Sequence, residues 1–234
     1  MPFYAVRKGR KPGIYTSWPE AQKQVSGFSG PQFKKFMSKR DAENYINDNK
    51  LLEKLGNDYS DIEIAQLAKK FPITVFTDGG AIGNNNADTS HPAAWSYSIQ
   101  ETATGKFISN PDAPAGQQLG ASNNVMEITA LIEALKELIN TGFNNKPILF
   151  GIDSSYTING VINLASYKAR GWKNSTGKVK NLSQWQQVDE LLQQIPEYRF
   201  VKIHSHDGDM SKNFFTRGND LVDRSLGRLT GHIG

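Results

Sequence analysis

The pattern of hydrophobic and polar positions changes once along the chain, between residues 46 and 71. Before this point the hydrophobic runs are short and are separated by turn residues, while Ser17 followed by Pro19 is typical of a helix start. Ala21 and Val25 then recur at helical spacing. The pattern predicts a small α/β domain over residues 1–46, with strands at residues 3–7, 13–16 and 33–36 and helices from residue 17 and at residues 39–46.

Residues 47–70 are rich in Asn, Asp and Lys and contain scattered Leu and Ile. This composition predicts a linker, with some helical character over residues 62–69.

From residue 71 onward the hydrophobic runs are longer. A β-branched run at residues 73–77 predicts a strand, and residues 94–100 and 106–109 fit two antiparallel partners joined by a turn. Apolar residues at helical spacing make residues 124–140 the clearest helix of the chain. The order of strands first, then alternating helices and strands, predicts a mixed sheet flanked by helices. The later predicted elements are strands at residues 147–152 and 199–203 and helices at residues 155–164, around residues 185–192 and at residues 219–229.

The net charge of +4 is unevenly placed along the 234 residues. Residues 1–50 hold ten Lys or Arg and four Asp or Glu, a net of +6, so the remainder sums to −2. The positive charge of residues 1–50 suggests a polyanionic partner, although a solvated basic surface explains the same charge. The chain has no cysteine, which excludes disulfides and thiolate zinc sites and leaves oxygen or imidazole ligands for any metal.

No apolar run approaches the roughly 20 residues that a membrane span requires. The first residues lack the apolar stretch of a secretory signal and have strand character at once. We therefore expect a cytoplasmic or otherwise intracellular protein with no membrane partner. The composition suggests no obligate oligomer, so a monomer is expected.

Two predicted strands are each followed by an aspartate, Asp78 and Asp153. In open α/β sheets this carboxyl edge is where ligands bind. Glu127 lies in the first turn of the strongest helix, and Asp223 lies in the last helix near Asp220. Each acid taken alone is more commonly a helix cap or a surface charge, but converging acids repel one another unless cations hold them. Hard oxygen ligands suit Mg²⁺ or Mn²⁺, and two such ions can clamp a phosphodiester.

Four motifs of the second region resemble, in order, those of type 1 ribonuclease H. They are Thr-Asp-Gly-Gly at residues 77–80 with Gly-Asn at 83–84, Ser-Asn-Asn-Val-Met-Glu at 122–127, Ile-Asp-Ser-Ser-Tyr at 152–156 and Gly-Asn-Asp-Leu-Val-Asp at 218–223.

Two further segments extend the resemblance to nearly the whole chain. Residues 166–182 hold five Lys or Arg and no acid, with Trp172 among them, and are similar to the basic protrusion of that family. Residues 3–36 resemble the hybrid-binding domain of its eukaryotic-type members. The resemblance therefore implies a ribonuclease H-like α/β fold with a mixed five-stranded sheet at residues 71–234, preceded by a small α/β hybrid-binding domain.

The resemblance also assigns roles to residues of this sequence. A histidine before the last helix would move protons or assist product release, and His206 matches the motif better than His204. The loop at residues 210–217 is longer than the family pattern. The implied metal ligands are Asp78, Glu127, Asp153 and Asp223; the implied RNA-strand contacts are Gly79, Asn84, Asn123, Asn124 and Ser155; the implied DNA-strand contacts are Lys168, Arg170, Trp172 and Lys173; and the implied hybrid contacts of the small domain are Tyr4, Trp18, Phe33, Lys34 and Lys35.

The expected function is endonucleolytic hydrolysis of the RNA strand of RNA–DNA hybrids with two Mg²⁺ ions, which Mn²⁺ can replace, giving 5′-phosphate and 3′-hydroxyl ends. Amide side chains suit the reading of 2′-hydroxyl groups, which distinguish RNA from DNA. Two alternatives stay open at this point. A resolvase or transposase domain shares the acids but lacks the asparagine pair, and an inactive hybrid-binding protein would bind without metal-dependent turnover.

Overall fold

The computed structural model describes residues 2–47, 50–82, 90–108, 113–174, 177–204 and 213–230. The chain divides into two compact units, Met1–Lys50 and Leu51–Gly234, which we call the first and second units. Among the described helices, none combines the length with the hydropathy that a bilayer-spanning segment needs.

The first unit has the predicted ββαβα order. Its antiparallel sheet has the strand order β2-β1-β3. Ala21 and Val25 of the first helix are buried against Val6, as their spacing predicts. The elements of this unit are β1 (Phe3–Lys8), β2 (Gly13–Tyr15), α1 (Trp18–Val25), β3 (Gln32–Phe36) and α2 (Lys39–Asn47).

The second unit contains the predicted mixed five-stranded sheet, in the order β10-β7-β4-β5-β6. β7 is parallel to both β4 and β10, whereas β5 is antiparallel to β4 and β6. β4 is therefore the central strand, with β5 and β6 on one side of it and the parallel strands β7 and β10 on the other. The strands are β4 (Ile73–Ala81), β5 (Pro92–Glu101), β6 (Ala115–Leu119), β7 (Ile148–Ile152) and β10 (Tyr198–Lys202).

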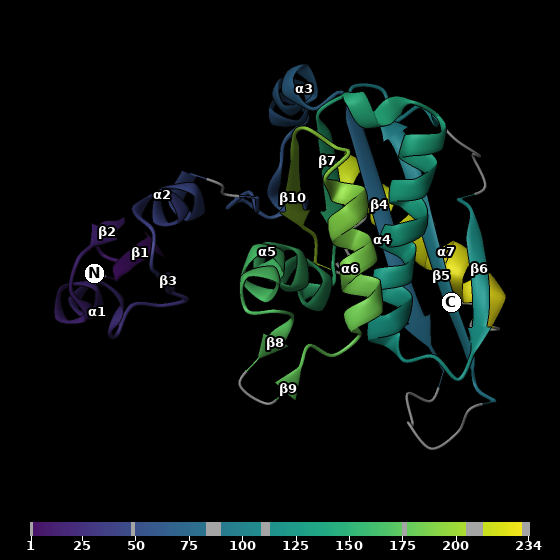
Figure 1. The fold of residues 1–234 in the computed structure, drawn as a ribbon. Coiled ribbons are helices and arrows are strands. Elements are labelled where there is room, and N and C mark those ends of the chain that lie inside the picture. Colours follow the sequence, from purple (N-terminus) through teal and green to yellow (C-terminus); the bar gives the residue numbers. More distant parts are fainter. Residues whose placement is uncertain are drawn as a thin grey trace. The chain divides into compact units, whose positions relative to one another are not determined.

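Helices cover both faces of this sheet (Figure 1). α4 and α6 pack on one face and α7 on the other, and the alternating side chains of β4 serve both cores. Val75 belongs to the core under α4, whereas Phe76 packs against Phe214 and Phe215 of α7. The remaining elements of the unit are η1 (Gly56–Asp58), α3 (Asp61–Lys70), α4 (Asn123–Asn140), η2 (Phe143–Asn145), α5 (Ser155–Ala169), β8 (Lys173–Asn174), β9 (Gly177–Lys178), α6 (Leu182–Leu192) and α7 (Phe214–Thr230).

The third strand of the sheet differs from the prediction. Residues 106–109 were expected to pair with β5. Of these, the described residues 106–108 pair with it only briefly: Phe107 forms an antiparallel bridge with Gln100, and backbone hydrogen bonds join Lys106 to Glu101 and Ile108 to Ile99. The N-terminal part of β5, up to Tyr97, pairs with residues 114–119 instead. This pairing begins where the Tyr97 N–H donates to the Pro114 carbonyl and continues through the register of β5 with β6. The edge strand is therefore β6.

Residues 51–70, expected to be part of a linker, pack with the second unit. The Leu52 N–H donates to the Phe200 carbonyl at 2.8 Å, so this segment covers the edge of β10. Ile64 of α3 is buried in the core that contains Phe71. The scattered Leu and Ile of this region thus have a tertiary role that their low density did not predict.

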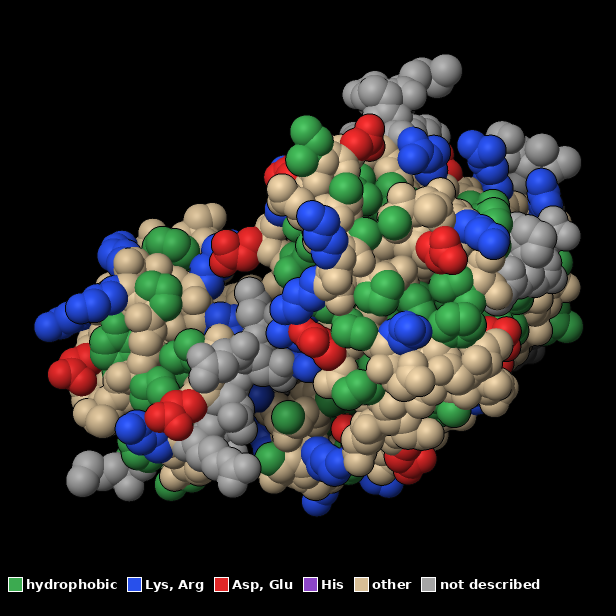
Figure 2. Space-filling view, turned by 90° about the horizontal axis from the view of Figure 1, so that it is seen from above, with side chains coloured by type: hydrophobic (Ala, Val, Ile, Leu, Met, Phe, Trp, Pro, Cys, Tyr) green, Lys and Arg blue, Asp and Glu red, His purple; other side chains and the backbone are tan. Residues whose placement is uncertain are grey.

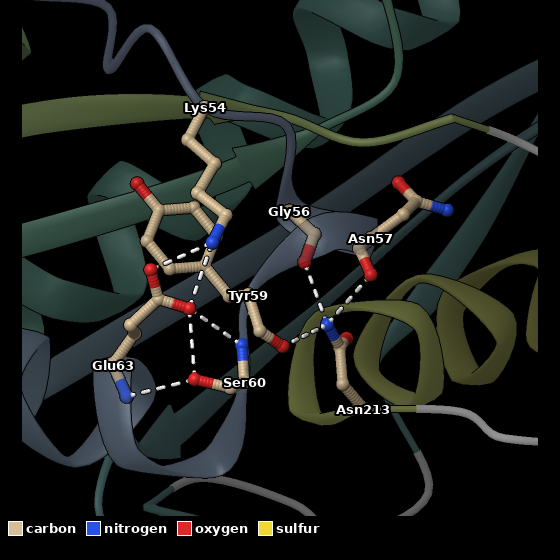
Figure 3. A network of polar contacts seen from close by, with 7 residues as sticks. All are labelled: Lys54, Gly56, Asn57, Tyr59, Ser60, Glu63 and Asn213. Atoms are coloured by element: carbon tan, nitrogen blue, oxygen red, sulfur yellow. Dashed lines mark hydrogen bonds and ion pairs between the residues drawn. The ribbon is translucent and has the colours of Figure 1, made fainter.

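Asn213 connects this segment to the start of α7 (Figure 3). Its side-chain amide donates to the carbonyls of Gly56 at 2.7 Å, Asn57 at 3.1 Å and Tyr59 at 2.9 Å. Its Oδ1 accepts from the backbone N–H groups of Phe215 and Thr216, which is the geometry of a helix N-cap. The cap explains why α7 begins at Phe214, five residues before the predicted start at residue 219.

The neighbouring contacts in Figure 3 stabilise the same segment. Ser60 and Glu63 form a capping box at the start of α3, and Lys54 donates to both oxygens of Glu63. These hydrogen bonds lower the pKa of the Glu63 carboxyl to about 2. Asn57 in turn accepts from the backbone N–H of His204, beyond the end of β10.

We predict that Asn213→Ala lowers the free energy of unfolding by about 2 kcal/mol, because it removes a helix cap and leaves three carbonyl groups without this donor. Asn163→Ala is the matched control, since Asn163 makes a single exposed hydrogen bond within α5. Urea denaturation of both variants checks the prediction. Equal stabilities of the two variants would contradict the role assigned to Asn213.

Candidate active site

The register of the central strands brings Asp78 and Asp153 together. The parallel pairing of β4 with β7 ends at Thr77 opposite Ile152, and the next residues of the two strands are Asp78 and Asp153. β4 itself continues to Ala81 because its other neighbour, β5, is longer than β7. Asp78 therefore lies inside β4, and not at its end as predicted, at the level where β7 stops.

Glu127 is delivered by the close approach of α4 to β4. A Cβ atom at Gly79 would lie 2.3 Å from the backbone nitrogen of Glu127, so only glycine permits this contact. Asn123, the first residue of α4, accepts a 2.6 Å hydrogen bond at its Oδ1 from the Ala81 N–H. These two contacts hold the first turn of α4 against the strand that contains Asp78.

The resulting cluster consists of Asp78, Glu127 and Asp153, each of which offers a carboxylate oxygen within 4.8 Å of the others. Asp78 is 9% exposed, and its Oδ1 accepts from the Gly79 N–H at 2.8 Å. Oε2 of Glu127 is buried and, among the described residues, has no hydrogen-bond partner. Three carboxylates this close can supply oxygen ligands to a hard divalent cation, and the buried Oε2 of Glu127 accepts no hydrogen bond from the described part of the chain that would compete with one.

Burial and mutual repulsion shift the carboxyl groups of the cluster upward. Burial, followed by the charges of Asp153 and Asp223, raises the pKa of Asp78 to about 7. The pKa of Glu127 is raised well above its ordinary value, mainly by burial and then by Asp78 and Asp153. Burial also raises the pKa of Asp153. Without a cation, the ionised cluster is therefore electrostatically unfavourable.

Asp223 approaches the cluster from α7, on the opposite face of the sheet from α4. Its charge contributes to the raised pKa values of Asp78 and Asp153, but it is not one of the three acids within 4.8 Å. The structure thus brings together three of the four predicted ligands and places the fourth nearby.

The predicted RNA-strand residues lie around the start of α4 and α5. Asn124 is half-buried in the first turn of α4, and Ser155 is exposed as the first residue of α5. Asn84 and His206 lie outside the described residues. His204, the alternative histidine, is exposed, and its backbone N–H and carbonyl are both bonded to Asn57.

The basic protrusion contains an extended helix followed by a hairpin. α5 continues to Ala169, beyond its predicted end at residue 164, and the short strands β8 and β9 follow. Arg170 and Lys173 are exposed, whereas Lys168 forms a 2.7 Å ion pair with Asp189. Trp172 is half-buried against the core of the second unit in a left-handed backbone conformation, so its indole supports the hairpin.

The first unit presents a row of aromatic rings. The Trp18 ring lies 5.6 Å from that of Tyr4 and 5.5 Å from that of Phe33, and it is 37% exposed. Lys35 pairs with Tyr4 in the sheet and has its Nζ 5.9 Å from the Tyr4 ring. Because side chains alternate along a strand, Lys34 lies on the opposite face of β3. The structure therefore groups Lys35, and not Lys34, with the aromatic row.

Figure 2 shows basic side chains dispersed over the drawn face of the protein, with acidic and apolar side chains between them. Local groups such as the aromatic row and the protrusion are therefore better defined candidates for nucleic-acid contacts than overall charge.

Sequence reasoning missed two residues of the site, Lys202 and Asn219. Lys202 donates from Nζ to the Asp153 carbonyl, and Asn219 donates from its side chain to the Asp153 carboxylate. Asn219 is 5% exposed. A lysine that ends a buried strand and an asparagine four residues before Asp223 were visible in the sequence, but neither spacing indicates which acid it meets.

The fold and this cluster define a class of α/β enzymes that hold divalent cations on carboxylates at the edge of a mixed sheet. The family model described as RNase H matches residues 70–228, and the model described as the ribonuclease H1 N-terminal domain matches residues 2–46. The chain therefore belongs to the ribonuclease H family and is a hydrolase. This confirms the resemblance seen in the motifs.

Relatives match one or both units. Ribonuclease H of Polaromonas naphthalenivorans (strain CJ2) is 32% identical over 164 residues, which cover 67% of this chain and 91% of the relative. Ribonuclease H1 of Mus musculus is 27% identical over an alignment of 257 positions, gaps included, that covers 95% of this chain and 87% of the relative. The structure of the foamy viral protease-reverse transcriptase in complex with RNA/DNA hybrid shares the fold, with a TM-score of 0.55 and 19% identity over 77% of this chain and 22% of that chain.

The raised pKa of Asp78 predicts how metal-free stability depends on pH. Between the ordinary pKa of 3.8 and the folded value of about 7, the folded protein binds more protons than the unfolded chain. Its free energy of unfolding therefore falls as the pH rises through this range. We expect Asp78→Asn to be more stable than the parent in EDTA above pH 7, by at most about 4 kcal/mol at about 1.4 kcal/mol per pKa unit, with the difference vanishing near pH 3.8.

Denaturation in EDTA at several pH values measures this difference. Asp61→Asn, at an exposed position of α3, is the control and should retain the pH dependence of the parent. An unchanged pH dependence in Asp78→Asn would refute the electrostatic cost assigned to the cluster.

Proposed function

We propose that this ribonuclease H cuts the RNA strand of RNA–DNA hybrids endonucleolytically, with two divalent cations, and leaves 5′-phosphate and 3′-hydroxyl ends. The observation that supports this most directly is the close grouping of Asp78, Glu127 and Asp153 at the sheet edge. The fold shared with a reverse transcriptase whose structure contains an RNA/DNA hybrid supports the substrate class.

The three clustered carboxylates would hold the cations, with Asp223 completing the ligand set from α7. Mg²⁺ is the expected ion, and Mn²⁺ can replace it, because both prefer oxygen ligands. Bound cations would lower the pKa of the attacking water and offset charge on the leaving oxygen. The chain orients the carboxylates through hydrogen bonds: the Gly79 N–H donates to Asp78, and the Ser154 side chain is hydrogen-bonded to Glu127.

Discrimination between the strands would come from residues on either side of this cluster. On the RNA side we propose Gly79, Asn123, Asn124 and Ser155, together with Asn84. Since Oδ1 of Asn123 accepts from Ala81, a contact from Asn123 to a 2′-hydroxyl would use its amide N–H groups as donors. His206 is proposed to move protons or to assist product release, as the motif implies.

On the DNA side we propose Arg170 and Lys173, which are exposed and can reach phosphate groups. Lys168 would leave its ion pair with Asp189 to bind a phosphate. Trp172 would position the hairpin by packing against the core of the second unit. The first unit would bind the hybrid separately and raise the concentration of the second unit along the same substrate molecule. We propose that the protein acts as a monomer.

Cleavage of matched duplexes tests this function. We expect the RNA strand of an RNA–DNA hybrid to be cut with Mg²⁺, whereas double-stranded RNA and double-stranded DNA stay intact, because strand discrimination needs 2′-hydroxyl groups on one strand and none on the other. End-labelled products should carry 5′-phosphate and 3′-hydroxyl groups, and EDTA should abolish cutting. Intact hybrid with both Mg²⁺ and Mn²⁺ would eliminate this activity, and cutting of double-stranded DNA would indicate a resolvase-like enzyme.

Two glutamates of α4 provide a matched pair for this assay. Glu127→Gln should reduce the rate by at least about a thousandfold, since it removes a ligand charge from the cluster. Glu133→Gln, further along the same helix and paired with Lys136, should keep the parental rate.

The role of the first unit is tested by measuring the affinity for the hybrid. The measurement uses the Asp153→Asn variant in EDTA, so that the hybrid is not cleaved. In that background, Trp18→Ala should weaken binding about tenfold or more, because stacking of one base on an aromatic ring contributes about 1–3 kcal/mol. Met37→Ala, which removes another exposed apolar side chain of this unit, is its control.

The two lysines of β3 provide a second comparison in the same assay. Lys35→Ala should weaken binding more than Lys34→Ala, because Lys35 shares the face of the aromatic row. Equal losses from the two lysine variants would show that the aromatic face does not define the binding surface.

A further inference from the structure

Lys202 ends β10 at the level where β7 ends. The two strands are parallel, and Lys202 is the register partner of Ile152, the residue before Asp153. This position places the lysine beside the acidic cluster, from a strand that contributes none of its acids. The side chain is part-buried, and its Nζ donates to the backbone carbonyl of Asp153.

The charge of Lys202 acts on two acids of the cluster. It lowers the pKa values of both Glu127 and Asp153 and so opposes the effect of burial. Among the described residues, the other contacts that favour the ionised carboxylates come from neutral groups: the side chains of Ser154 and Asn219 and the backbone N–H groups of Gly79 and Asp153. A neutral donor orients a carboxylate, whereas a cation also offsets its charge.

The positive charge of Lys202 has two opposite effects. Before a divalent ion binds, Lys202 reduces the repulsion among the carboxylates, and its hydrogen bond fixes the backbone between β7 and α5. Once a divalent ion is present, the lysine repels it, because both charges are positive and share a partly desolvated site.

We propose that Lys202 is an internal counter-cation of the acidic cluster, which stabilises the metal-free site and weakens the binding of divalent cations. It is a positioning residue that acts through Asp153 and Glu127. The consequence is a site that stays assembled without metal and exchanges its cations more readily than the carboxylates alone would allow. This inference rests on the proposed binding of metal to the cluster.

Thermal unfolding of the full chain without nucleic acid tests the proposal, with MnCl₂ or MgCl₂ added in steps after removal of metal by EDTA. We expect Lys202→Met to lower the midpoint of unfolding in EDTA. The variant should also lower the metal concentration needed for half of the maximal stabilisation, by roughly tenfold, because it removes the repulsion between Lys202 and the bound ion. Isothermal titration with MnCl₂ should show the same change in affinity.

Three further variants separate charge from packing. Lys202→Gln removes the charge but keeps a donor, and it should reproduce the tighter metal binding even if the methionine variant folds poorly. Lys202→Arg keeps the charge and should retain the parental metal dependence. Lys69→Met, at an exposed position of α3, should change neither quantity.

The outcomes distinguish this inference from the proposed function. Metal dependence that is unchanged in both Lys202→Met and Lys202→Gln, with stabilisation by metal still present, would overturn the role of Lys202 alone and leave it as a backbone tether. If neither cation stabilised the parent protein, the proposed metal site and this inference would both be wrong.

Discussion

The close approach of α4 to β4 at Gly79 is the contact on which the active site depends. The strand and the first turn of the helix lie so near that a Cβ atom at this position would meet the backbone of Met126 and Glu127. This distance lets a carboxylate from a helix reach one inside the sheet. The end of β7 then adds Asp153 at the same level, and three acids from separate elements converge.

This convergence has an electrostatic cost that the rest of the second unit must offset. Ionised carboxylates in a buried position repel one another, and a loosely packed site would relieve the repulsion by turning them toward water. Here β4 is held between two apolar cores, and residues 51–70 pack against β10 and the start of α7. A rigid scaffold of this kind keeps the acids preorganised for cations.

Much of the fold could be predicted because local patterns report burial. The apolar spacing of α4 and the β-branched run of β4 predicted a long helix and a strand correctly, and the order of elements predicted the mixed sheet. Two segments show what the patterns left out: the strand expected at residues 106–109 pairs with β5 only briefly, and residues 51–70, whose expected helix is present as α3, pack with the second unit. In both cases the outcome depends on which segment of the chain pairs with an open strand of the sheet: residues 114–119 pair with β5, and Leu52 bonds to β10. Local composition has no information about this competition.

The sequence by itself determined the chemistry of this protein: oxygen ligands without thiolates, four acids in ordered motifs, and an aromatic and basic first unit. Its motifs also identified the family. Only the tertiary structure decided which groups meet, because side chains from distant segments become neighbours through strand register and helix packing. It placed Lys202 and Asn219 on Asp153 and separated Lys34 from Lys35 across a sheet. Periodicity shows which side of an element is buried, but it does not show what lies across from it.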